Sequence, residues 1–126
     1  MRGVWIADTL GEMGLWYRLA PIAFVGRSLT TPGGGQNLLE PALLRCAILV
    51  GPHTGNFEEH VRLLREADAL AVVSDAAELA RTVGELLLDY DRCNGMGERA
   101  AAAVQRERDL PARTATALRA LLDGTA

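Results

Sequence analysis

The chain has 126 residues and a formal net charge of -3. This length supports one domain with a buried core, and the charge gives no indication of a nucleic-acid-binding surface. All 13 basic residues are arginine, which excludes a Schiff-base lysine and the lysine of a phosphate-binding loop. No signal peptide and no apolar run of about 18 residues is present, so we expect a soluble protein of the reducing cytoplasm.

Four short apolar runs are the strand candidates. They occupy residues 4–7, 22–26, 47–50 and 69–73. Continuous rather than alternating apolar runs are typical of strands that are buried on both faces of a parallel sheet. Helical periodicity follows each run, at residues 13–19, 38–44, 57–66 and 77–88. This order predicts an α/β fold in which helices flank a Rossmann-like parallel sheet of four strands.

The four strand-to-helix junctions share one local signature, a potential helix cap followed three residues later by glutamate. The pairs are Thr9 with Glu12, Asn37 with Glu40, Asn56 with Glu59, and Asp75 with Glu78. This is the spacing of a capping box, in which the cap and the glutamate each accept a backbone hydrogen bond.

The pattern changes after Leu88. We predict an alanine-rich helix at residues 99–108 and a closing helix at residues 114–122, after Pro111, with no strand before either. We therefore treat residues 1–126 as a single domain in which residues 89–126 are terminal helices.

The loop after the second apolar run contains Gly33, Gly34 and Gly35 and leads into a helix. Ligands of open parallel sheets bind beyond the carboxyl ends of the strands, where glycines permit close approach and offer N–H groups. The spacing matches no standard phosphate-binding motif, so a flexible loop is the alternative. Glu40, directly after this loop, could accept hydrogen bonds from ribose hydroxyls, and helix capping explains it equally well.

Other chemically capable residues have simpler interpretations. His53 has no second ligand at metal spacing and is interpreted as structural or exposed. Cys46 is interpreted as a small core residue. Trp5, Trp16 and Tyr17 are interpreted as core or interface aromatics.

Four motifs occur in order: Asp-Thr-Leu-Gly-Glu-Met (8–13), Phe-Val-Gly-Arg-Ser-Leu (24–29), Gly-Gly-Gln-Asn-Leu-Leu-Glu-Pro (34–41) and Gly-Pro-His-Thr-Gly-Asn-Phe (51–57). Together they resemble the C-terminal half of the 3-deoxy-D-manno-octulosonic acid (Kdo) transferases, over residues 4–125. These glycosyltransferases transfer Kdo from CMP-Kdo to a lipid A precursor in lipopolysaccharide biosynthesis. The resemblance implies the donor-binding, C-terminal half of a GT-B fold, with no metal or other cofactor.

The resemblance also implies site residues. Glu40 would hold the ribose of CMP, the glycine loop with Asn37 would approach the phosphate and sugar, and residues 9–11 would line the cytosine pocket. The implied donor-binding set is Thr9, Leu10, Gly11, Glu12, Ser28, Gly34, Gly35, Gln36, Asn37, Leu38 and Glu40.

The chain departs from the family pattern at single positions. Gln36 stands where histidine is frequent, Arg27 where a second glycine is usual, and Leu38 where proline is common. The family's N-terminal half carries the membrane anchor, the acceptor surface and the proposed catalytic base, and it has no counterpart here. We therefore expect a fragment that binds the donor but is inactive alone, from an enzyme of the cytoplasmic face of the inner membrane.

Two other functions remain open. The chain could be another GT-B nucleotide-sugar enzyme, such as an epimerase, in which case it should prefer UDP to CMP. It could also be a non-catalytic interaction domain that uses an incomplete sheet edge for docking. Self-association or capture of a partner would favour that interpretation.

Overall fold

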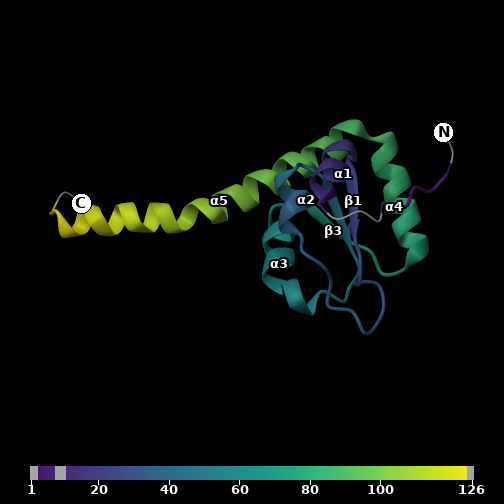
Figure 1. The fold of residues 1–126 in the computed structure, drawn as a ribbon, viewed down its shortest axis with the longest axis horizontal. Coiled ribbons are helices and arrows are strands. Elements are labelled where there is room, and N and C mark those ends of the chain that lie inside the picture. The colour runs from purple at the N-terminus through teal and green to yellow at the C-terminus, as the bar shows by residue number, and fades with distance from the viewer. Residues whose placement is uncertain (1–2, 8–10, 125–126) are drawn as a thin grey trace.

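The computed structural model describes residues 3–7 and 11–124. Figure 1 shows a small α/β body from which one long helix projects. The elements, in chain order, are α1 (Met13–Leu19), β1 (Ile22–Val25), α2 (Leu39–Leu43), β2 (Ala47–Val50), the 3-10 helix η1 (Gly55–Phe57), α3 (Glu58–Glu66), β3 (Leu70–Val72), α4 (Ala76–Leu88) and α5 (Tyr90–Leu122).

Three parallel strands form the sheet, in the order β1-β2-β3. In the register, Ile48 of β2 lies between Ala23 of β1 and Leu70 of β3. All four residues of β2 are buried, as expected for the central strand of a sheet covered on both faces. The predicted Rossmann-like parallel sheet flanked by helices is confirmed.

The two faces of β2 belong to two core clusters, because successive side chains of a strand point to opposite faces. Ile48 and Val50 pack in one cluster with residues of α2, α3 and the middle of α5. Ala47 and Leu49 pack in the other with residues of α4 and the start of α5. Figure 1 shows α3 and α4 on opposite sides of the strands.

Helix α5 passes over the amino ends of the strands and so contributes to both clusters. The Sγ of Cys93 donates a hydrogen bond to the carbonyl of Pro21, just before β1, at 3.6 Å. One turn further along, Gly97 lies directly against the backbone of Arg45, just before β2, where any Cβ would collide with the Arg45 carbonyl. The absence of a side chain at Gly97 thus permits this close crossing.

The prediction of a fourth strand at residues 4–7 is wrong. The described sheet has three strands, and the side chains of Val4, Trp5 and Ile6 are 91%, 75% and 85% exposed. The ring of Trp5 contacts the ring of Trp16, with centroids 5.7 Å apart. An apolar run becomes a buried strand only where a neighbouring strand and covering helices exist, and β1 remains an edge strand here.

The predicted division of the C-terminal region into two helices is also wrong. Helix α5 is continuous for 33 residues and contains Pro111. Proline removes one N–H group from the helix and disfavours a helical conformation before it. Residues 105–119 are exposed, so water can bond the carbonyl that loses its partner.

Of the predicted capping boxes, the one at α4 forms. The Glu78 N–H donates to Asp75 Oδ1 at 2.8 Å, and the Ser74 N–H donates to Glu78 Oε2 at 3.1 Å. Helix α3 begins after Phe57 without a side-chain cap, so the box predicted at Asn56 is wrong. Glu12 is the N-cap of α1 and makes no side-chain capping bond, and Thr9 lies outside the described residues.

Cys46 is fully buried, which confirms its interpretation as a core residue. Within the described ranges, no helix combines the length and the apolar character that a membrane span requires.

Candidate functional site

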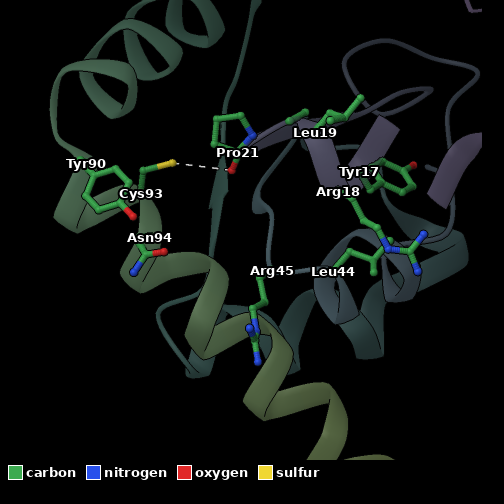
Figure 2. A pocket seen from close by; sticks show the side chains of 10 residues that line it. Tyr17, Arg18, Leu19, Pro21, Leu44, Arg45, Tyr90, Cys93 and Asn94 are labelled. Carbon is green, nitrogen blue, oxygen red and sulfur yellow. Dashed lines mark hydrogen bonds between the residues drawn. The ribbon is translucent and has the colours of Figure 1, made fainter. Parts of the chain in front are cut away.

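Two cavities lie at opposite ends of the sheet. The first, of about 220 Å³, lies near the amino ends of β1 and β2 and is lined by Tyr17, Arg18, Arg45, Tyr90 and Cys93, among others. Figure 2 shows the guanidinium groups of Arg18 and Arg45 pointing in different directions, so they do not form a paired cationic site. Ligands of open parallel sheets bind at the other end, beyond the carboxyl ends of the strands.

The second cavity lies at that carboxyl end and has a volume of about 390 Å³. We call it the β1-end cavity. It is lined by helix α1, by the end of β1 and the residue after it, and by the loop before α2 together with the first turn of α2. Its lining residues are Met13, Tyr17, Phe24, Val25, Gly26, Gln36, Asn37 and Glu40.

Glu40 is available to a ligand in this cavity. The Leu39 N–H donates to Asn37 Oδ1 at 3.0 Å, but the N-cap of α2 is Leu38 and no side chain caps this helix, so the capping box predicted at Asn37 and Glu40 is wrong. Among the described residues, the Glu40 carboxylate has no hydrogen-bond or ion-pair partner. Its Oε1 lies 3.5 Å from the position that a Cβ on Gly14 would occupy, so the carboxylate rests beside the backbone of α1. Capping therefore does not account for this side chain.

Tyr17 adds a polar group to the same cavity. Burial raises the pKa of its phenol, and the negative charge of Glu40 and then the thiol of Cys46 raise it further. The phenol is consequently neutral at neutral pH and can donate a hydrogen bond. The sequence interpretation of Tyr17 as a core or interface aromatic missed this position. The available signal was its spacing of four residues from Met13, which places both on one face of α1.

The glycine loop is held by hydrogen bonds within the protein. The Gly34 N–H donates to the His53 carbonyl at 3.0 Å, and the Gly35 N–H donates to the Arg27 carbonyl at 2.8 Å. Both glycines have positive φ, at 105° and 82°. The expectation that these two N–H groups are free for an anion is therefore wrong, because they fix the loop that leads to Gln36 and Asn37.

Two of the predicted residues, Ser28 and Leu38, are buried and do not line the cavity. The side chain of Ser28 is completely buried, where its Oγ donates to the Val25 carbonyl at 2.6 Å and accepts from the Gly51 N–H at 2.9 Å. Leu38 is 1% exposed and belongs to the core. Their side chains support the loops around the cavity.

Two further predicted residues, Gly11 and Glu12, lie at the start of α1. Gly11 is exposed with φ of 87°, and Glu12 is the N-cap of α1. Neither lines the β1-end cavity. Thr9 and Leu10 lie outside the described residues. The structure thus brings together Gln36, Asn37 and Glu40 of the predicted set and adds Met13, Tyr17 and Phe24 to them. In the part of the chain that the structure describes, no cluster of His, Cys, Asp or Glu side chains could hold a metal ion.

No protein-family model matches the chain. It is 40% identical over 86 residues to a probable mitochondrial 3-deoxy-D-manno-octulosonic acid transferase of Arabidopsis thaliana, an alignment covering 67% of this chain and 19% of that protein. It is 36% identical over 115 residues to the 3-deoxy-D-manno-octulosonic acid transferase of Bordetella pertussis, covering 91% of this chain and 27% of that protein.

A solved structure gives the corresponding fold. The crystal structure of the C-terminal CMP-Kdo binding domain of WaaA from Acinetobacter baumannii matches with a TM-score of 0.74 and 34% sequence identity, over 79% of this chain and 51% of that chain. The chain belongs to the Kdo transferase family. It corresponds to the C-terminal part of a Kdo transferase, and its match spans 19% to 27% of the length of the two curated relatives above. The predicted family is confirmed.

Proposed function

We propose that the chain is the donor-binding part of a Kdo transferase and that it holds CMP-Kdo in the β1-end cavity. The observation that carries this proposal is the Glu40 carboxylate, which lines the cavity and serves neither as a helix cap nor in an ion pair with a described residue. The similarity to a domain described as CMP-Kdo binding supports the choice of ligand.

In this proposal the residues that line the cavity bind different groups of the donor. Glu40 accepts hydrogen bonds from the two ribose hydroxyls, and the amide groups of Gln36 and Asn37 contact the sugar and phosphate. Tyr17 can donate a further hydrogen bond beside Glu40. Residues 9–11, proposed to line the cytosine pocket, directly precede Glu12 and Met13 at the start of α1, and Met13 lines the cavity.

The transfer of Kdo to a lipid A precursor is a proposal for the complete enzyme, at the cytoplasmic face of the inner membrane. The relatives are several times longer than the matched region, and we place no catalytic residue in this chain. In a GT-B enzyme the catalytic base and the acceptor surface would come from the other half.

Replacing Glu40 with alanine tests the donor site. We expect Glu40→Ala to weaken CMP binding at least about tenfold, because two hydrogen bonds to a charged group are lost. Since Glu40 makes no capping bond, the free energy of unfolding should change little. Binding is measured by amide NMR titration with CMP, where wild-type shifts should centre on residues 34–40.

The matched control is Asp75→Ala, which removes a cap that the structure does contain. It should lower the free energy of unfolding by about 1 kcal/mol and leave CMP affinity unchanged. Tighter binding of UDP than CMP would favour another nucleotide-sugar enzyme. The donor site would be refuted if Glu40→Ala lost stability like Asp75→Ala but kept its affinity.

A further inference from the structure

Arg27 has a left-handed backbone conformation in the loop after strand β1, where no helix ends. Three described non-glycine residues have positive φ: Arg27 (56°), Arg45 (65°) and Asp68 (55°). Arg45 and Asp68 directly follow the C-caps of α2 and α3.

Both of those helix ends form the hydrogen bond expected there. The Cys46 N–H donates to the Pro41 carbonyl at 3.0 Å, and the Ala69 N–H donates to the Leu64 carbonyl at 2.8 Å. These bonds belong to the motif that ends helices through a left-handed residue. Arg27 follows strand β1 instead, so helix termination does not account for its conformation.

Arg27 lies at the junction of the β1-end cavity and the glycine loop. The preceding residue, Gly26, lines the cavity together with Glu40. The Arg27 carbonyl accepts the Gly35 N–H at 2.8 Å, which fixes the backbone of Arg27 against the loop. Its side chain is exposed, and none of the carboxylates in residues 3–7 and 11–124 forms an ion pair with it. The backbone of Arg27 is therefore held next to a cavity-lining residue, and its exposed guanidinium group has no carboxylate partner among the described residues.

We propose that Arg27 binds the phosphate of the CMP group. This inference rests on the proposed function and names a further donor-binding residue. Glycine would adopt this backbone conformation without strain, and the chain nevertheless carries an arginine here. Strained residues persist where the surrounding structure holds them and the site uses them. A guanidinium group can bind a phosphate through two parallel hydrogen bonds, and the chain has no lysine for this task.

The test compares CMP with cytidine, which lacks the phosphate, by isothermal titration of the wild type and of Arg27→Gly. We expect Arg27→Gly to weaken CMP binding at least about tenfold and to leave cytidine affinity within about twofold. Arg27→Lys should retain an intermediate CMP affinity. The control, Arg45→Gly, removes a left-handed arginine away from the cavity and should leave CMP affinity unchanged. Thermal midpoints of both glycine variants should be equal to or above that of the wild type.

Any other result contradicts the proposal that Arg27 binds the phosphate. An equal loss of CMP and cytidine affinity would mean that Arg27 only shapes the loop. A loss seen with CMP-Kdo but not with CMP would assign Arg27 to the Kdo carboxylate. If Glu40→Ala abolishes CMP binding while Arg27→Gly does not weaken it, the donor site stands and Arg27 has no part in it. If the wild type binds neither ligand, the proposed function fails together with this inference.

Discussion

Replacing Gly97 with alanine should lower the free energy of unfolding by at least about 3 kcal/mol. The new Cβ would lie 2.7 Å from the Arg45 carbonyl carbon and closer still to its oxygen. Both are backbone atoms next to strand β2, so they cannot move aside as a flexible side chain could. Helix α5 would have to move away from the sheet and expose Met96 and Ala100, which are buried on either side of Gly97. Urea denaturation followed by circular dichroism measures this change.

Gly84→Ala is the matched control, because Gly84 lies inside α4 and a Cβ there would meet no atom within 4 Å. Alanine has the higher helix propensity, so this variant should be more stable by about 1 kcal/mol. Equal stability of Gly97→Ala and the wild type would contradict the close crossing of α5 over the amino ends of the strands.

Removing the hydroxyl of Ser28 should cost about 2 to 3 kcal/mol of unfolding free energy. Ser28→Ala leaves the Val25 carbonyl and the Gly51 N–H buried without their present partner, and water cannot replace a group that is completely buried. The hydroxyl joins the loop after β1 to the loop after β2, so the β1-end cavity should also lose its shape. Chemical denaturation gives the stability, and CMP titration at low temperature gives the affinity of the folded fraction.

Ser74→Ala provides the comparison, since Ser74 is exposed and contributes its backbone N–H to the cap of α4. Its stability should stay within about 0.5 kcal/mol of the wild type. If Ser28→Ala were as stable as Ser74→Ala, the two hydrogen bonds of the Ser28 hydroxyl would not contribute to the stability of the fold.

Three of the four strands predicted from the sequence are present, and the fourth, at residues 4–7, is absent. Residues 22–25, 47–50 and 70–72 form strands inside the predicted runs. Residues 4–7 have the same apolar pattern. Whether they form a strand depends on whether another segment of the fold covers them, and the local sequence pattern does not contain this information. Likewise, Pro111 indicated a helix boundary, and only the exposure of this region shows why α5 continues through it.

The part of the candidate site that could be predicted is the part in which the residues are close together in the sequence. Glu40, Asn37 and Gln36 follow the glycine loop directly, so they necessarily reach the same end of the sheet. Whether Glu40 caps α2 or faces a ligand depends on the entry angle of the chain, and spacing could not distinguish the two. Tyr17 and Phe24 reach the cavity through the packing of α1 against α2 and through the edge position of β1, both of which are tertiary features.

The long projecting helix has a consequence for how the chain behaves in solution. At 33 residues α5 is about 50 Å long, whereas a compact chain of this size has a radius of gyration of about 14 Å. Small-angle scattering should give a clearly larger radius, and gel filtration should show early elution of a monomer. Because an elongated monomer elutes early, gel filtration would overestimate its mass and suggest a dimer. The true mass must therefore come from sedimentation equilibrium. A monomeric mass combined with a compact radius would contradict the projecting helix.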